Sequence, residues 1–300
     1  MLRLKRVGTG PILTPRPDVF WEKDTVFNAA AIYDEALSQG PYHLLYRAVA
    51  HNPGDPNRSS IGYASSADGI HFERLPEPVL RPGVVPEESQ GVEDPRVVKM
   101  GDTFYMTYTA YDLAWAQIAL ATSQDLIHWQ RHGVIIDHEL FGHNKDSALF
   151  PEKIHGRYCL MHRPDPDIYL AFSDDLHHWT DHVCLMQPKF PWEVTKIGGG
   201  AQPIKTEKGW VIVTHGVDAD LEYRLGIALL DLADPTRVIA RQATPILAPE
   251  ADWERTGDVN NVVFTCGAIL RERELWVYYG AADTVIGLAK APIDDFLNDI

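Results

Sequence analysis

The chain has 300 residues with 45% hydrophobic composition, which is enough to bury a large core. Its net charge of −15 argues against a general binder of nucleic acid or of acidic membranes, so any anion site must be a local exception to an acidic surface. The cysteines Cys159, Cys184 and Cys266 are odd in number, widely spaced and without a CxxC pattern, which favours buried free thiols in a reducing cytosol over a disulfide framework or a zinc site.

The N-terminal stretch Met1–Arg6 is basic, but no apolar segment follows it, and we expect no signal peptide. No window approaches the roughly 18 apolar residues that a membrane-spanning helix needs. The sequence therefore predicts a cytoplasmic protein without a membrane partner.

Strand-forming segments recur along the whole chain. Short runs rich in Val, Ile, Tyr, Phe and Trp alternate with Gly, Pro, Asp and Asn, a pattern that predicts many β-strands. Five apolar strands are predicted at His43–Tyr46, Phe104–Tyr108, Tyr158–Met161, Trp210–Thr214 and Leu275–Tyr279. The alternating strands predicted to follow them lie at Ile61–Ala64, Gln117–Thr122, Ile168–Phe172, Arg224–Leu229 and Val285–Ala289.

A short motif follows each alternating strand. Its clearest copies, at 65–72, 122–129 and 172–179, contain Ser and Asp and end on an aromatic residue; weaker echoes lie at 230–235 and 291–296. Although His128, His177 and His178 stand beside the repeated Asp, a motif that every unit shares favours a structural role, with the Asp capping a turn and the aromatic packing between units.

Repeats of about 40–50 residues with roughly four strands each are typical of a propeller. We predict an all-β, five-bladed β-propeller that occupies residues 1–300 as one domain, with the segment up to about Val26 closing the ring against the last blade. A β-sandwich would not explain the recurring motif, and a parallel β-helix has shorter rungs.

Loops at one face of a propeller build its site, so the informative positions are the starts of the first strands and the ends of the second strands. The predicted first-strand starts are Asn28, Asp94, Lys145 with Asp146, Gln202, and Asn260 with Asn261. The predicted second-strand ends are Arg47, Tyr111, Arg163, His215 and Asp283. Because unlike polar residues occupy equivalent positions, we expect one shared central site.

This predicted site is rich in cations, namely Lys145, Arg163, Lys196 and His215. Arginine offers a planar fork and lysine a mobile charge, and both suit phosphate or carboxylate. Gly198–Gly200 would let the backbone approach a ligand, and Tyr223 could add a hydrogen bond.

Asp94 is predicted to lie across from these cations and could act as a general acid if burial raises its pKa. Glycoside hydrolysis ordinarily needs two carboxyls. Asp283 could be the second, or could bind sugar hydroxyls. If bound phosphate is the nucleophile, one acid and an anion cradle are sufficient for phosphorolysis.

Taken together, these residues resemble glycoside hydrolase family 130, the β-mannoside phosphorylases, over roughly Asn28 to Ala289. The resemblance rests on the stretches 91–96 (GVEDPR), 144–146 (NKD) followed by 149–154, 161–164 (MHRP), 215–217 (HGV) and 279–284 (YGAADT).

The resemblance implies a five-bladed propeller and a role for each of nine residues. Asp94 matches the general acid, thought to protonate the glycosidic oxygen through the mannose 3-hydroxyl. The implied phosphate-binding residues are Arg163, Lys196, His215, Tyr223 and Lys145, which stands where several relatives carry Arg. The residues implied to hold mannose are Asn28, Arg47 and Asp283.

The implied reaction converts a β-mannoside and phosphate into α-mannose 1-phosphate and a shortened acceptor, with inversion and with no metal or organic cofactor. Inorganic phosphate is a co-substrate. The alternatives are a hydrolase of β-mannosides or arabinosides, with Glu93 or Asp283 activating water, and a non-catalytic sugar-binding propeller. The sequence leaves open the linkage (β-1,2 or β-1,4), the acceptor and whether the chain forms a homo-oligomer.

Overall fold

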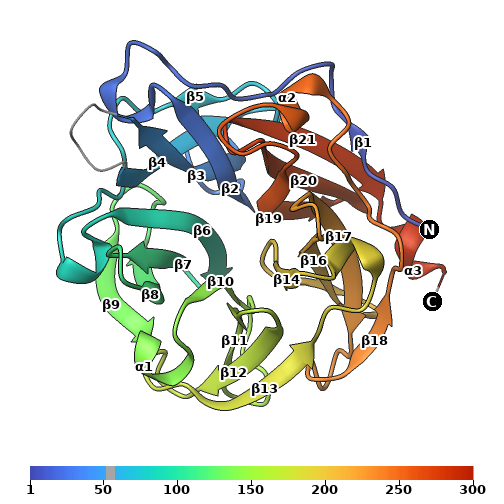
Figure 1. The fold of residues 1–300 in the computed structure, drawn as a ribbon. Helices are drawn as coiled ribbons and strands as arrows, with labels where there is room; N and C mark the ends of the chain where they lie inside the picture. Colours follow the sequence, from blue (N-terminus) through green and yellow to red (C-terminus); the bar gives the residue numbers. More distant parts are fainter. Residues whose placement is uncertain (52–57, 300) are drawn as a thin grey trace.

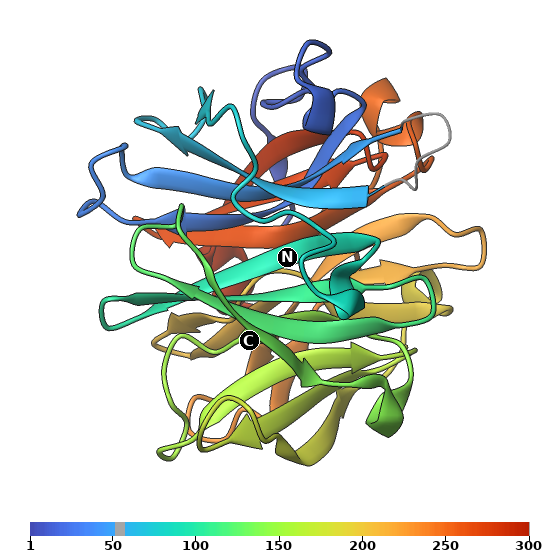
Figure 2. The ribbon, with the colours of Figure 1, turned by 90° about the vertical axis from the view of Figure 1, so that its left-hand side faces the viewer.

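Antiparallel sheets surround a common centre in the computed structural model, which describes residues 1–51 and 58–299 (Figure 1). In this part of the chain they form five blades, confirming the predicted five-bladed propeller. One parallel pair, Ser59 with Gly91, joins the first blade to the second. In the side view the second blade, in green, lies between the blue first blade and the yellow-green third blade (Figure 2).

In the first three blades the strands follow one another in sequence from the centre outwards. The first blade contains β2 (Thr25–Tyr33), β3 (Tyr42–Ala50), β4 (Arg58–Ser66) and β5 (Glu73–Arg74). The second contains β6 (Gly91–Met100), β7 (Thr103–Tyr111), β8 (Ala116–Ser123) and β9 (Gln130–Ile136). The third contains β10 (Asn144–Leu149), β11 (Tyr158–Pro164), β12 (Ile168–Ser173) and β13 (Thr180–Met186).

The last two blades depart from this plan. In the fourth, β14 (Lys196–Gly199) and β15 (Ile204–Thr206) both pair with β16 (Gly209–Val217), followed by β17 (Tyr223–Leu230) and β18 (Val238–Arg241). The fifth contains β19 (Val263–Arg271), β20 (Glu274–Ala281), β21 (Val285–Pro292) and the N-terminal β1 (Lys5–Arg6). The helical turns are η1 (Phe20–Glu22), η2 (Pro86–Glu88), α1 (His138–Phe141), η3 (Pro191–Glu193), α2 (Asp252–Arg255) and α3 (Asp294–Leu297).

All ten predicted strands fall within these elements. The inner strands are buried along nearly their whole length, whereas an outer strand such as β13 is largely exposed. Burial between two neighbouring blades also explains the near-continuous apolar runs of second strands such as β16. Apolar clusters fill the space between successive blades, so the core is distributed around the ring.

The repeated motif is structural, as expected. In three blades an Asp side chain accepts two backbone N–H groups and also pairs with a His three residues later: Asp68 with His71, Asp125 with His128 and Asp175 with His178. The turns follow the third strands, whereas the predicted site residues lie at the opposite strand ends. The cysteine prediction is correct for Cys159 and Cys266, which are buried free thiols, and wrong for Cys184, whose side chain is exposed.

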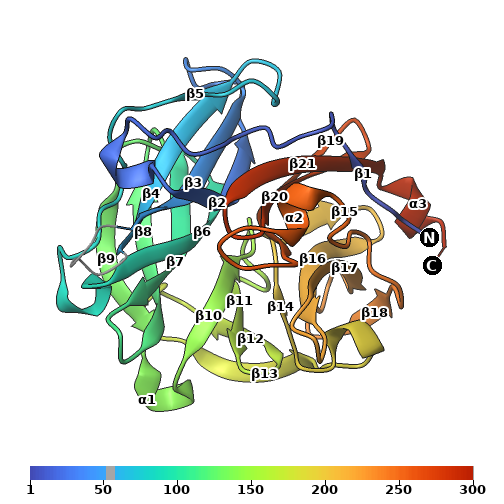
Figure 3. The same cartoon turned by 45° about the horizontal axis from the view of Figure 1, so that its top comes forward.

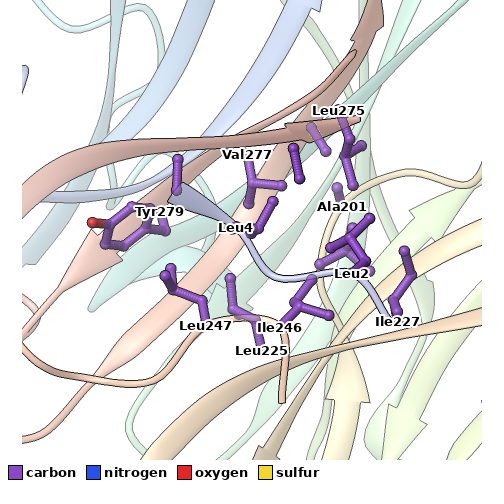
Figure 4. Close-up of a cluster of buried hydrophobic side chains, with 14 of the residues drawn as sticks. Leu2, Leu4, Ala201, Leu225, Ile227, Ile246, Leu247, Leu275, Val277 and Tyr279 are labelled. Carbon is purple, nitrogen blue, oxygen red and sulfur yellow. The ribbon is translucent and has the colours of Figure 1, made fainter. Parts of the chain in front are cut away.

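The N-terminal segment closes the ring, as predicted. Lys5 and Arg6 pair with β21 of the last blade (Figure 3). The Leu4 amide donates to the Ile246 carbonyl at 2.9 Å, and Leu2 and Leu4 are buried in the cluster between the last two blades (Figure 4). The chain therefore completes its last blade with residues from its other end.

We expect Leu4→Ala to lower the free energy of unfolding by about 2–5 kcal/mol, because it leaves a cavity beside the closing strand. Lys5→Ala is the matched control, since the neighbouring side chain is exposed and its loss should cost less than about 0.5 kcal/mol. Urea unfolding of the two variants checks this. Equal stabilities would show that apolar closure contributes little.

Candidate active site

A cavity of about 450 Å³ opens at the centre of one face of the ring. All nine predicted site residues line it: Asn28, Arg47, Asp94, Lys145, Arg163, Lys196, His215, Tyr223 and Asp283. The other lining residues are Tyr111, Ala116, His143, Asp146, Asp165, Val259, Val262 and Phe264. All five blades therefore contribute to one site.

Three equivalent β-bulges build the floor of this cavity. They interrupt β2, β6 and β10 and hold Asn28, Asp94 and Asp146 at φ values of +48°, +50° and +55°. Asn and Asp tolerate this left-handed conformation better than other side chains except glycine. The bulge turns each of these residues out of the strand pairing at the centre of the ring.

This register corrects the prediction for the third blade. Lys145 pairs with Arg163 just before the bulge, as Glu93 pairs with Thr109, so Asp146 rather than Lys145 is equivalent to Asp94. The cavity therefore contains a second buried first-strand acid. This acid, Asp146, lies among the cations, whereas Asp94 is the acid predicted from the sequence to lie across from them.

Two other predicted strand starts lie elsewhere. Asn260 and Asn261 are exposed in the loop before β19 and do not line the cavity. Gln202 lies between β14 and β15 and donates to the carbonyl oxygens of Ala31 and Ala268, which ties the fourth blade to the first and fifth blades. Lys196 begins the innermost strand of the fourth blade instead.

Asp94 is 6% exposed and accepts hydrogen bonds from two mannose-site candidates. The Asn28 Nδ2 atom lies 3.0 Å from Asp94 Oδ1, and an Arg47 guanidinium nitrogen lies 3.3 Å from it. Burial opposes the ionisation of Asp94, but the charges of Arg47 and Arg96 outweigh burial and lower its pKa. The sequence-based prediction of a general acid requires a raised pKa for Asp94, whereas in this structure its pKa is lowered instead.

The proton-holding carboxyl of the cavity is Asp283, between β20 and β21. Burial raises the pKa of Asp283 to about 7, with Arg47 opposing the rise and the nearby Asp94 charge adding to it. The pKa values of Asp94 and Asp283 are thus shifted in opposite directions, so that at neutral pH Asp94 is ionised and Asp283 is near half-protonated.

The side chains of Lys145, Arg163, Lys196 and His215 form one wall of the cavity, the cation-rich wall, and Asp146 lies among them. Its Oδ2 atom pairs with Arg163 Nε, its Oδ1 atom lies 3.2 Å from an Arg96 nitrogen, and Oδ2 lies 3.6 Å from His215 Nε2. Burial opposes the ionisation of Asp146, but the charges of Arg163 and Arg96 lower its pKa. Gly198 makes this packing possible, because a Cβ there would lie 2.6 Å from Asp146 Oδ2.

His215 is a neutral member of the cation-rich wall. The side chain is 1% exposed, and burial lowers its pKa to about 3, with Asp146 opposing the shift. Burial also lowers the pKa of Lys196, and the Arg163 charge adds to that shift. The wall therefore carries three full positive charges, on Lys145, Arg163 and Lys196, rather than four.

Arg96 was not among the predicted site residues. It is 2% exposed and donates to the backbone carbonyls of Asp94, Gly199 and Gly200 as well as to Asp146. It fixes the second, third and fourth blades to one another beneath the cavity. Only its position in the GVEDPR stretch could have pointed to it.

Glu93 lies next to Asp94 but is engaged by cations on both sides. An Arg47 nitrogen lies 2.8 Å from Oε1 and the Lys145 ammonium lies 3.3 Å from Oε2. Glu93 is 5% exposed and does not line the cavity. Glu93 therefore links Arg47 to Lys145 and is not placed to activate water.

In residues 1–51 and 58–299, no cluster of three or more His, Cys, Asp or Glu side chains is arranged to hold a metal ion. The same residues contain no helix with the length and apolar character needed to cross a membrane.

Comparison with known proteins agrees with the sequence resemblance. Residues 12–300 match the model of glycoside hydrolase family 130, described as beta-1,4-mannooligosaccharide phosphorylase. A 1,2-beta-oligomannan phosphorylase from Thermoanaerobacter sp. (strain X514) is 46% identical over 98% of this chain and 99% of that protein. A beta-1,2-mannobiose phosphorylase from the same strain is 49% identical over 96% and 97% of the two chains. The solved structure of a Listeria innocua beta-1,2-mannobiose phosphorylase with beta-1,2-mannobiose is 31% identical and superposes with a TM-score of 0.88 over 99% of both chains.

The raised pKa of Asp283 predicts a pH dependence of stability. Because this pKa exceeds that of an unfolded Asp, the folded chain holds more protons between about pH 4 and pH 7, and the free energy of unfolding should fall as the pH rises. Over this pH range we expect the free energy of unfolding of Asp283→Asn to fall by about 2 kcal/mol less than that of the wild type. This figure is reduced to allow for the part of the side chain that water reaches.

Urea unfolding between pH 5 and pH 8 measures this difference. Asp102→Asn, at an exposed turn, is the matched control and should keep the wild-type slope. A wild-type slope in Asp283→Asn would contradict the assignment of the raised pKa to this carboxyl.

Proposed function

The chain belongs to glycoside hydrolase family 130, and we propose that it is an inverting phosphorylase of short β-1,2-linked mannooligosaccharides. The three relatives above are all named for β-1,2 linkages, although the family model is described by β-1,4. The observation that carries the proposal is that Lys145, Arg163 and Lys196 line the same cavity as Asp94.

The reaction is a single displacement at the anomeric carbon of the terminal mannose. A phosphate oxygen forms the new bond to C1 while the C1–O bond to the acceptor breaks, which gives α-mannose 1-phosphate with inversion. The leaving oxygen takes a proton from Asp94, either directly or through the mannose 3-hydroxyl. Phosphate is already anionic, so no protein base is needed.

The cation-rich wall is the proposed phosphate site. Arg163 pairs through Nε with Asp146 and through one terminal nitrogen with Asp165, and all three residues line the cavity, so the second terminal nitrogen is the one proposed to bind phosphate. Lys145 and Lys196 add mobile charges, and Tyr223, whose ring stacks beside His215 at 6.1 Å, borders the same wall. Phosphate here would offset the positive charge of Lys196, whose pKa burial lowers.

The opposite side of the cavity is the proposed mannose site. Asn28 and Arg47 come from the first blade and Asp283 from the fifth, and Asn28 and Arg47 also contact Asp94. These groups supply donors and acceptors suited to sugar hydroxyls. Gly280 lets Asn28 occupy its place, because a Cβ there would lie 2.9 Å from the Asn28 backbone nitrogen.

Phosphate binding would also prepare Asp94 for its role. Lys145 is one of the charges that lower the pKa of Asp94. A phosphate ion beside Lys145 would offset that charge, so the pKa of Asp94 should rise when the nucleophile is bound. Asp283 can hold a proton nearby at neutral pH. Proton donation is thereby coupled to the presence of the nucleophile.

The test is phosphate-dependent release of mannose 1-phosphate from β-1,2-mannobiose, with β-1,4-mannobiose as the comparison substrate. Turnover to free mannose that is indifferent to phosphate would support hydrolysis and overturn the proposal. Equal turnover of β-1,4-mannobiose would overturn the proposed preference for the β-1,2 linkage. Because every step uses side chains and phosphate, activity should survive treatment with a chelator.

We expect Asp94→Asn to lower kcat by about 10²–10⁴-fold, the usual contribution of general acid catalysis. Asp102→Asn at the exposed turn is the control and should keep wild-type turnover. Steady-state rates with β-1,2-mannobiose and phosphate give the measurement. Retained turnover in Asp94→Asn would exclude it as the acid.

We expect Lys196→Ala to raise the KM for phosphate by about 10-fold or more, since a hydrogen bond to a charged group contributes about 1.5–3 kcal/mol. The KM for the mannoside should change little. Lys205→Ala, at a surface lysine paired with Glu152, is the control. An unchanged phosphate KM in Lys196→Ala would remove this residue from the phosphate site.

A further inference from the structure

We propose that the anion site selects an oxyanion that carries a proton, such as hydrogen phosphate or hydrogen arsenate, and rejects sulfate. The selecting groups are two hydrogen-bond acceptors in the cation-rich wall, the Asp146 carboxylate and the His215 ring. This inference rests on the proposed function for the location of the phosphate site.

Asp146 is an ionised carboxylate on the wall of an anion site. It lines the cavity beside Lys145, Arg163 and Lys196. Three nitrogens approach it, from Arg163, Arg96 and His215. Since an ionised carboxylate has about four acceptor positions, at least one remains for another donor.

His215 presents a second acceptor. Its Nε2 atom faces Asp146 Oδ2 at 3.6 Å, and a proton on Nε2 is favoured by that carboxylate. A neutral ring with its proton on Nε2 has a lone pair on Nδ1. Nδ1 is buried and has no hydrogen-bond partner among the described residues. Such an atom lacks a donor that a ligand hydroxyl could supply.

The two acceptors distinguish oxyanions that the cations alone would not. Lys145, Arg163 and Lys196 attract phosphate and sulfate alike, because both are tetrahedral anions. A fully deprotonated oxyanion beside Asp146 is repelled by the carboxylate charge and has no proton to donate to it. A P–OH group donates a hydrogen bond to the carboxylate or to the ring, and this bond offsets the repulsion.

Phosphate and arsenate keep at least one proton at neutral pH, whereas sulfate has none. Sites built to bind a hydroxyl of their substrate reject analogues without it by large factors, because their buried polar groups are left unpaired. The buried acceptors Asp146 and His215 therefore predict strong discrimination. A site with cations alone would show little.

The test is calorimetric titration of the wild-type protein at pH 7 with phosphate, arsenate and sulfate. We expect phosphate and arsenate to bind within about 10-fold of each other and sulfate at least about 100-fold more weakly. Sulfate affinity within about 3-fold of phosphate, or no binding of any of the three, overturns the inference. Binding is measured apart from turnover, so selective binding without mannose 1-phosphate formation would overturn the proposed function alone.

Asp146→Asn tests the carboxylate directly. Removing its charge should strengthen sulfate binding at least about 10-fold relative to phosphate, whereas a residue that only positions Arg163 would weaken both anions equally. Equal weakening, or unchanged selectivity in a folded variant, overturns the inference. Asp102→Asn is the matched control. If Asp146→Asn fails to fold by thermal melting, the wild-type titration still decides.

Discussion

Arg96 is a buried charge at the centre of the ring, and the arrangement of the active site follows from its need for partners. It is 2% exposed and requires several acceptors, since an unpaired buried charge is strongly unfavourable. Three of these acceptors are backbone carbonyls, at Asp94, Gly199 and Gly200, and the fourth is the Asp146 carboxylate. The bulge at Asp94 and the innermost strand of the fourth blade are thereby fixed relative to each other. The contacts of Arg96 therefore set the distance between the proposed acid and the proposed phosphate site.

Much of this could be predicted from the sequence because the propeller repeats itself. The ten predicted strands, which are the second and third of each blade, carry apolar runs that burial between blades requires. Polar residues at strand ends, together with the family resemblance, identified nine cavity-lining residues, from Asn28 to Asp283. A repeated pattern compensates for the weak signal of any single strand. The N-terminal closure was predictable because the last blade would otherwise lack a strand.

The residues that the sequence did not reveal depend on register. A bulge adds residues to one strand without changing its apolar pattern, so Lys145 and Asp146 were equally plausible inward positions. The pairing of Lys145 with Arg163 decides between them in the structure. Asn260 was misplaced for a different reason, since the loop before β19 extends further than the pattern suggests. The lowered pKa of Asp94 could not be predicted from the sequence either. This pKa depends on the charge of Arg47, which comes from the first blade, and on that of Arg96, which follows the bulge in β6.

The charges of the cavity also bear on why phosphate rather than water would be the nucleophile. Arg47, Arg96 and Lys145 hold Asp94 ionised, and an ionised acid cannot protonate a leaving group. Water brings no charge to offset these cations, whereas a phosphate ion beside Lys145 does. Glu93, the other candidate for activating water, is held between Arg47 and Lys145 and is absent from the cavity wall. Lys145 would thus both help to bind the nucleophile and help to keep Asp94 ionised until phosphate arrives. This disfavours hydrolysis, although no group of the cavity is needed to exclude water.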